Sequence, residues 1–438
     1  MKIHSQQCLF DTWQATSAPM FHTSEFWPRF SETNIRQFLE STGDQPTPSQ
    51  ALNEEGIRAS KHKIKAFLRH IQPLDSTTFP CKDEYVAFEQ ERLVLLNVVL
   101  GANQAEQLAD YNDELYGSLA DMHYHEVLQY LKHYLQNLDP RSAPVSAARD
   151  LLLETWHTMG SDNMLVSGIF AQADAYRLKL RPLVAYRFGF LETLLETHQP
   201  NEILTPQAAQ SILQSSLKPT LGEAGTSWTT IIQDGAPNVF IDYEHHAIVI
   251  PAGRNYTLAQ IRVLVVHEIG VHVTRSVRGE TSHERLAGYG LHGYGPTEEA
   301  FAELLGTAGT SHRPNLGPLE AFAIIDFATP ATGRSFREVY DLVKALILCL
   351  ANPDDTQLDQ HRYNYQRKAF ARTIRMLRLG TNVLVDRSMT KYWRGGLLLN
   401  HYFQSHEVNE QTVGEFLLGK YEPTNLAQLE LIKHHTRG

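Results

Sequence analysis

The sequence predicts a mostly helical α+β protein with one small sheet. Along much of the 438-residue chain, apolar residues recur three or four positions apart, which is the period of an α-helix. Residues 228–251 differ, because short β-rich runs alternate there with polar turns. Directly afterwards comes an apolar helical stretch that contains imidazole and carboxylate side chains. These three observations place the sheet and the candidate site in the second half of the chain.

Residues 1–200 are predicted to form a mostly helical N-terminal region, and residues 201–438 the core that carries the site. Residues 1–50 show no clear period and are expected to be irregular, and Pro140 and Pro144 mark a break between helices. A further helix is expected to start at Thr205-Pro206, with proline at its first position, and to run to about Ser216. The helical stretches expected before it are 84–99, 125–135, 147–159 and 178–197.

The runs 238–243 and 247–251 flank a polar turn at Glu244–His246 and predict a β-hairpin. Thr257 and Gln260 then form a capping-box pattern, in which each side chain satisfies a free backbone amide of a helix start. We expect that helix to continue to about Arg278. A glycine-rich loop, residues 288–295, and a helix from about Thr297 follow.

Composition argues against several classes of partner. Lys and Arg number 39 and Asp and Glu 49, which gives a formal charge of −10 and no basic surface for nucleic acid or anionic membranes. The three cysteines form no CxxC pair, and the sequence shows neither a secretory signal pattern nor an apolar run long enough to span a membrane. We therefore expect a cytoplasmic protein.

The candidate chemistry lies in the sequence His267-Glu268-Ile269-Gly270-Val271-His272, directly after the apolar run 261–266. Burying such groups without partners costs on the order of 2–7 kcal/mol for a neutral polar group. A metal ion would satisfy them. Zinc peptidases typically carry HExxH, in which the two histidines share one face of a helix. Here the histidines are five residues apart, so on a regular helix they would diverge by about 140°.

A single π-turn removes this difficulty, because pairing between residues five apart brings the second histidine back into line. Gly270, between the two histidines, can adopt the adjusted backbone without a side-chain clash. The sequence therefore predicts a local widening of the helix over residues 267–272. The alternative is that His267 and His272 are unrelated, in a chain that has 21 histidines.

A catalytic zinc site needs a third protein ligand and an open position for water. Glu299 is predicted as that ligand, since small residues at 300 and 302 allow its helix to approach the first one. Glu303, one turn further on, is predicted to accept a hydrogen bond from the outer nitrogen of a zinc-bound histidine, and Glu298 is expected to point elsewhere. The other ligand candidates downstream are Glu280, His283, Glu284 and His292, and the acidic residues 298–303 alternatively form a solvated helix start.

These residues resemble the flavohaemoglobin expression-modulating QEGLA-motif family, which includes the microtubule-associated tyrosine carboxypeptidases of animals. The resemblance rests on HEIGVHVTR at 267–275 and EEAFA at 298–302, and more weakly on RMLRLG at 375–380 and YWRGG at 392–396. It covers roughly the second half of the chain. It implies a gluzincin-like metallopeptidase core in which His267, His272 and Glu299 bind one Zn²⁺ and Glu268 is the catalytic base.

The sequence departs from the family motif in one respect. Where the family has Gln-Glu-Gly-Leu-Ala, this chain has Glu-Glu-Ala-Phe-Ala at 298–302, which keeps the ligand but adds bulk beside it. Zinc binding should survive this change. The preference of the animal enzymes for a C-terminal tyrosine of tubulin does not transfer.

The substrate side is predicted from the same region. The resemblance places Tyr392 as a second donor to the oxyanion, and a packed core tyrosine is the alternative. A free substrate carboxylate would be recognised by cations, for which Arg375, Arg378 and Lys391 are the candidates, with ordinary surface cations as the alternative. Residues 247–250 are expected to pair with an extended peptide by strand addition.

Together these predictions describe a zinc-dependent metallopeptidase, most simply a carboxypeptidase that removes C-terminal residues from peptides or proteins. Glu268 would accept a proton from the attacking water and return it to the leaving amine. Two alternatives stay open. One is a non-catalytic regulator that keeps zinc for stability, although a structural site needs no adjacent base. The other is an amidase that acts on a small peptide-like metabolite.

Overall fold

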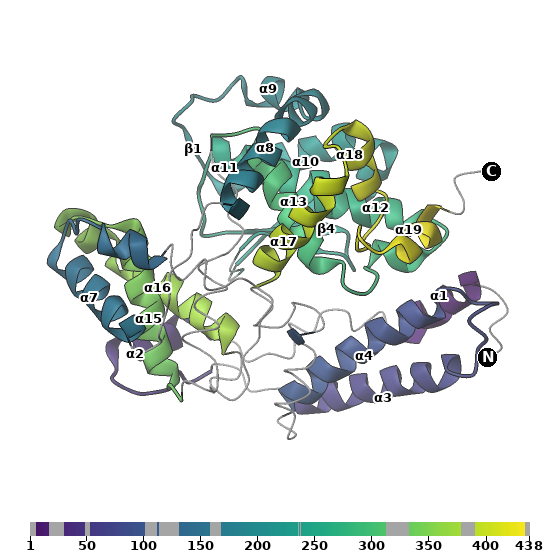
Figure 1. Ribbon diagram of the computed structural model, residues 1–438, viewed down its shortest axis with the longest axis horizontal. Helices are drawn as coiled ribbons and strands as arrows, with labels where there is room; N and C mark the ends of the chain where they lie inside the picture. The colour runs from purple at the N-terminus through teal and green to yellow at the C-terminus, as the bar shows by residue number, and fades with distance from the viewer. Residues whose placement is uncertain are drawn as a thin grey trace.

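The computed structural model is predominantly helical, with a small sheet in its second half (Figure 1). The residues that it describes are 6–16, 30–48, 53–100, 112–113, 131–157, 168–234, 236, 238–311, 333–377 and 390–433.

The elements before residue 205 are mainly helices. They are α1 (Gln6–Thr16), α2 (Glu32–Glu40), α3 (Glu54–Ile71), α4 (Lys82–Val99), α7 (Ala143–His157), α8 (Gly168–Arg187), α9 (Phe190–Leu195) and the short strand β1 (Ile203–Leu204).

The expectation that residues 1–50 are irregular is wrong, because α1 and α2 lie there. α2 begins at the N-cap Ser31 and buries only Ile35 and Phe38, too few apolar positions to establish a period. The predicted break between helices is present at residues 137–142, which include Pro140, while Pro144 lies in the first turn of α7, where its missing amide hydrogen costs nothing. The predicted helix 178–197 is divided between α8 and α9. Residues 125–130 of the predicted helix 125–135 lie outside the described residues.

The elements from residue 205 onward contain the sheet and the candidate site. They are α10 (Pro206–Leu221), η3 (Gly222–Ser227), β2 (Thr229–Gln233), β3 (Phe240–Asp242), β4 (Ala247–Pro251), β5 (Tyr256–Thr257), α11 (Leu258–Leu264), the π-helix η4 (Val265–Val273), α12 (Thr274–Glu280), η5 (Arg285–Gly288), α13 (Gly295–Ala308), α15 (Phe336–Ala351), α16 (Asp355–Met376), α17 (Lys391–Ser405), α18 (Glu410–Phe416) and α19 (Leu426–Lys433).

The larger sheet has the strand order β2-β4-β3, and β1 pairs with β5 in a separate two-stranded sheet. β3 and β4 form the predicted antiparallel hairpin, with Ile241 opposite Ile248. β2 pairs with the other edge of β4 in parallel, from Thr229 opposite Ala247 to Gln233 opposite Pro251. Both edges of β4 are therefore occupied. The prediction that residues 247–250 add a substrate strand is wrong, because no backbone edge is left for it.

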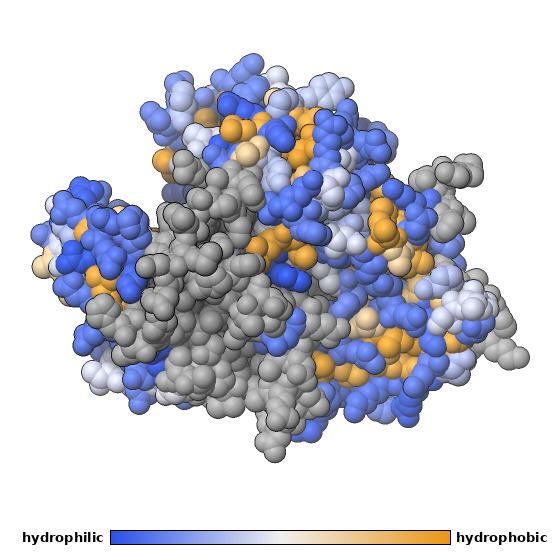
Figure 2. All heavy atoms as spheres, in the orientation of Figure 1, coloured by the Kyte–Doolittle hydropathy of each residue, from blue (hydrophilic) through white to orange (hydrophobic). Residues whose placement is uncertain are grey.

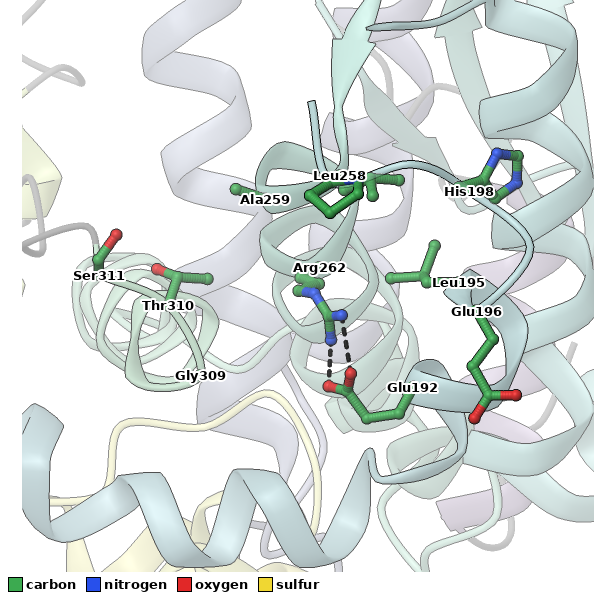
Figure 3. A pocket seen from close by; sticks show the side chains of 11 residues that line it. Glu192, Leu195, Glu196, His198, Leu258, Ala259, Arg262, Gly309, Thr310 and Ser311 are labelled. Atoms are coloured by element: carbon green, nitrogen blue, oxygen red, sulfur yellow. Dashed lines mark hydrogen bonds and ion pairs between the residues drawn. The ribbon is translucent and has the colours of Figure 1, made fainter. Parts of the chain in front are cut away.

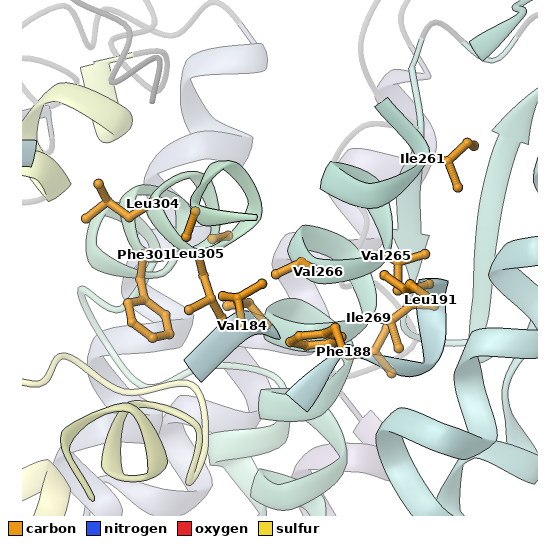
Figure 4. Packing of buried hydrophobic residues seen from close by; sticks show 14 of the residues in the cluster. Val184, Phe188, Leu191, Ile261, Val265, Val266, Ile269, Phe301, Leu304 and Leu305 are labelled. Atoms are coloured by element: carbon orange, nitrogen blue, oxygen red, sulfur yellow. The ribbon is translucent and has the colours of Figure 1, made fainter. Parts of the chain in front are cut away.

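One hydrophobic cluster surrounds the candidate site. The η4 side chains Val265, Val266 and Ile269 belong to this cluster, together with Val184 of α8, Leu191 of α9 and Leu304 and Leu305 of α13 (Figure 4). α13 also packs along α17. The apolar run before His267 is thus buried at Ile261, Val265 and Val266 but partly exposed at residues 262–264, so its composition predicts its burial only in part.

The remaining buried residues join segments that are distant in sequence. α2, α7, α15 and α16 share one cluster, which lies at the left of Figure 1. Another cluster joins Trp13 of α1 and Tyr85 of α4 to Leu286 of η5 and Tyr421. Buried clusters therefore contain residues from both sides of position 200, and the division into two regions there stays a prediction.

The described surface on the face shown in Figure 2 is largely hydrophilic, with small groups of hydrophobic residues between. Among the described helices, none is both long and apolar enough to cross a membrane.

Candidate metal centre

The helix that carries both histidines begins at Thr257 and changes its winding in the middle. The capping box of Thr257 and Gln260 is present in full, as predicted. Nine residues, Val265–Val273, then form the π-helix η4 before α12 continues to Glu280. The amide of Thr274 donates to the carbonyl of Ile269, five residues back. The widening predicted from the spacing of the histidines is therefore confirmed, and it extends beyond residues 267–272.

Gly270 is required for packing rather than for backbone freedom. Its φ is not among the positive glycine φ values of the described chain. A Cβ atom at this position would instead lie 2.5 Å from Cζ of Phe188, which follows α8. The predicted reason for this glycine is thus replaced by a steric one.

Three possible ligand atoms face one another at this widening. Oε2 of Glu299 lies 3.9 Å from Nε2 of His267 and 3.8 Å from Nε2 of His272. A tetrahedral zinc ion with bonds of about 2.0–2.1 Å separates its ligands by about 3.4 Å, so small side-chain shifts suffice to close such a set. The two imidazole rings are 4.9 Å apart and inclined by 67°. The third predicted ligand therefore lies where a shared ion would need it.

Glu268 lies beside these atoms. One oxygen of its carboxylate and one ring nitrogen from each of His267 and His272 all lie within 4.8 Å of one another. Burial raises the pKa of Glu268 to about 7, so this carboxyl group can hold or release a proton near neutral pH. This carboxyl group is therefore suited to the proton transfer predicted for it.

The prediction that Glu298 points elsewhere is wrong. Oε1 of Glu298 lies 2.5 Å from Nδ1 of His272, and both side chains are buried. When Nδ1 donates its hydrogen to this carboxylate, the lone pair of Nε2 is free to bind a metal ion. The sequence predicts Glu303 as the acceptor of a hydrogen bond from a metal-bound histidine. Glu303 lies on α13 one turn after Glu299, and this hydrogen bond stays a prediction.

Two buried cations stabilise the charge of Glu298. Nη1 of Arg275 donates to Oε2 of Glu298 at 3.1 Å. Nζ of Lys420 lies 3.3 Å from the centre of the Tyr243 ring and has no hydrogen-bond partner in the described structure. Burial raises the pKa of Glu298, but the charges of Lys420 and Arg275 outweigh it and bring the pKa down to about 2. Burial lowers the pKa of Lys420 to about 8.

α17 brings two predicted residues to Glu299. Nζ of Lys391 donates to Oε1 of Glu299, which leaves Oε2 facing the histidines. The hydroxyl of Tyr392 also hydrogen-bonds to Glu299. Burial opposes ionisation of Glu299, yet the charges of Lys391, His272 and His267 hold its pKa well below the ordinary value. Lys391 is a neighbour of the predicted ligand, and its role toward substrate stays a prediction.

Of the two other cations predicted to bind substrate, the structure describes Arg375 but not Arg378. Arg375 is exposed near the end of α16, and its charge lowers the pKa of Tyr392, against the larger effect of burial, which raises it. Arg378 lies outside the described residues.

The two histidines differ in protonation. Burial lowers the pKa of His267 to about 3, and the charge of His272 adds to this effect. Burial also acts to lower the pKa of His272, but its hydrogen bond to Glu298 and the surrounding carboxylates raise it overall. A neutral imidazole is the form that binds a metal ion, and His267 is already in that form at neutral pH.

A pocket of about 450 Å³ lies elsewhere, between α9, the start of α11 and the end of α13. Arg262 and Glu192 form an ion pair within it (Figure 3). Its lining residues do not include the histidines or carboxylates described above. It is therefore separate from the candidate metal centre.

Comparison of the chain with family models, curated proteins and solved structures gives no match.

Proposed function

We propose that this protein is a zinc-dependent metallopeptidase with a gluzincin-like core, and that it acts as a carboxypeptidase on peptide or protein C-termini. The observation that carries the proposal is that Oε2 of Glu299 lies 3.9 Å from Nε2 of His267 and 3.8 Å from Nε2 of His272, beside the carboxyl group of Glu268. The resemblance of the HExxxH and EEAFA motifs to the QEGLA-motif family supports the same activity.

His267, His272 and Glu299 would hold one zinc ion. Two imidazoles and one carboxylate are a ligand set of catalytic zinc sites, which leave one position open. These side chains are not sealed off, since 13% of the His267 side chain and 16% of the Glu299 side chain remain exposed. When bound, zinc would polarise the scissile carbonyl and lower the pKa of a water molecule.

Glu268 would carry the proton during hydrolysis. Its pKa of about 7, raised by burial, lets it accept a proton from the attacking water and donate that proton to the leaving amine. The ionised Glu298 would meanwhile hold Nδ1 of His272 and so fix the direction of its Nε2.

Residues of α17 would contact the substrate. The Tyr392 hydroxyl keeps its proton, because burial and the charge of Glu299 raise its pKa well above the ordinary value, so it can donate to a developing oxyanion. Lys391 and Arg375 would attract a free C-terminal carboxylate, since Lys391 contacts Glu299 and the charge of Arg375 acts on Tyr392.

The test combines metal analysis with peptide cleavage. Purified wild type is expected to contain about one zinc ion per chain, and His267→Ala is expected to lose it. Incubation of wild type with a peptide mixture should release single C-terminal residues, which mass spectrometry detects, and Glu268→Gln should keep zinc but abolish the release. Zinc binding without cleavage of any peptide would instead favour a regulator, and cleavage confined to small metabolites would favour an amidase.

A further inference from the structure

Arg275 is completely buried on α12, three residues after His272, and each nitrogen of its guanidinium donates a hydrogen bond. Nη1 donates to Oε2 of Glu298 at 3.1 Å. Nε donates to the carbonyl of Gly419 at 2.6 Å, and Nη2 to the carbonyl of Tyr421 at 2.7 Å. Three acceptors in fixed directions leave this planar group one orientation.

Glu298 connects Arg275 to the candidate metal centre. One of its oxygens contacts Arg275 and the other contacts Nδ1 of His272 at 2.5 Å. Only 3% of the Glu298 side chain is exposed, so little water is available to replace either partner. The direction of the His272 ring thus depends on a carboxylate whose own position depends on Arg275.

The two carbonyl acceptors are themselves fixed. They belong to the segment 419–421 between α18 and α19, which forms backbone hydrogen bonds with the region around η5. The amide of Lys420 donates to the carbonyl of Ala287 at 2.7 Å, and the carbonyl of Lys420 accepts from the amide of Leu291 at 2.8 Å. The segment 419–421 therefore anchors Arg275 from the side opposite Glu298.

We infer that Arg275 is a positioning residue for the zinc site: anchored by the carbonyls of Gly419 and Tyr421, it holds Glu298 so that Nδ1 of His272 donates a hydrogen bond and Nε2 faces His267 and Glu299. This inference rests on the proposed function. Carboxylates that orient a metal-bound histidine contribute about 10–100-fold to metal affinity, and Arg275 acts through such a carboxylate.

The test measures zinc affinity directly, by competition with a chromophoric chelator. Arg275→Met is expected to weaken zinc binding by about 10–100-fold, and Glu298→Gln by about 10-fold or more. Arg275→Lys keeps a charge but not the fork of donors, so it should recover only part of the affinity. Arg278→Met is the matched control, because Arg278 is exposed on the same helix, and its zinc affinity should equal that of wild type.

A second measurement needs no variant of Arg275. In ¹⁵N spectra of zinc-loaded wild type, His272 is expected to carry its hydrogen on Nδ1, protected from exchange by Glu298. A spectrum with the hydrogen absent from Nδ1 overturns the inference even if Arg275→Met fails to fold. Wild-type zinc affinity in folded Arg275→Met also overturns it, while the proposed function stands. A wild type that binds no zinc overturns both.

Discussion

Gly395 of α17 lies against Pro296 of α13, so closely that a Cβ atom at position 395 would be 1.8 Å from the Pro296 carbonyl oxygen. The same atom would lie 2.8 Å from Cβ of Ala300. The two helices therefore cross at a glycine. Lys391 and Tyr392 lie one turn before this crossing, and the contact places them beside Glu299.

We expect Gly395→Ala to force the two helices apart. The added methyl group meets backbone rather than a flexible side chain, so the free energy of unfolding should fall by about 1–3 kcal/mol. Urea denaturation measures this change. Gly414→Ala is the control, because Gly414 lies in α18 with no atom within 4 Å of the added Cβ. For this control, the free energy of unfolding should rise by about 0.5–1 kcal/mol. If Gly395→Ala did not lower the free energy of unfolding, that result would contradict the steric role of Gly395.

Gly270→Ala should also destabilise the protein, since its Cβ would lie 2.5 Å from Cζ of Phe188. The expected loss is about 1–3 kcal/mol in the free energy of unfolding. Because the clash is with a side chain, Phe188→Leu in the same chain should recover part of that loss. A double-mutant cycle measures the coupling. Purely additive effects of the two substitutions would show that Gly270 is needed for another reason.

Tyr392→Phe should lower kcat by about 10²-fold if the hydroxyl donates to the oxyanion. Zinc content should stay at the wild-type level, because the predicted ligands are unchanged. The measurement is steady-state cleavage of a peptide that wild type hydrolyses. Tyr402→Phe, on the same helix, is the control and should keep wild-type kcat. Equal rates for Tyr392→Phe and wild type would make Tyr392 a packing residue only.

His246 is expected to make a pH-dependent contribution to the free energy of unfolding. It turns the chain between β3 and β4 with φ of 47°, stacks on Trp228, and places Nε2 3.7 Å from Oε1 of Glu280. The nearby carboxylate of Glu280 raises the pKa of His246 above its ordinary value, against the opposing effect of burial. Because the folded state favours the protonated ring, this contribution is present below the unfolded pKa and is lost as pH rises through the folded pKa.

His246→Asn should remove this dependence, and asparagine tolerates a positive φ. The difference in free energy of unfolding between wild type and variant should be larger at about pH 5.5 than at about pH 8.5. The change should stay below about 1 kcal/mol, because the pair is partly exposed. Urea denaturation at both pH values tests this, and an equal difference at both would refute the pairing of His246 with Glu280.

The features that follow from local spacing could be predicted from the sequence. A spacing of five positions from His267 to His272 leaves no regular helix that aligns them, so the π-helix follows from geometry. The capping box at Thr257 and the hairpin formed by β3 and β4 likewise depend on neighbouring residues. The convergence of Glu299 on both histidines was anticipated from the motif and its likeness to a known family.

The features that depend on contacts between distant parts of the sequence could not be predicted. Which of two adjacent carboxylates, Glu298 or Glu299, meets His272 Nδ1 depends on the rotation of α13, which its packing against α17 and η4 sets. The parallel pairing of β2 with β4 occupies the strand edge that was predicted to bind substrate. No local sequence pattern predicts this pairing. Lys420 and Arg275 are distant in the sequence and come together around Glu298 only in the folded chain. The one local indication is Arg275 itself, a charged residue at the end of the apolar HEIGVHVTR motif.

The dependence of Arg275 on residues 419 and 421 has a consequence for biosynthesis. A ribosome releases His267, Glu268 and Glu299 long before it adds the carbonyls that hold the arginine. A nascent chain thus presents its histidines before the backbone that holds their supporting arginine has been synthesised.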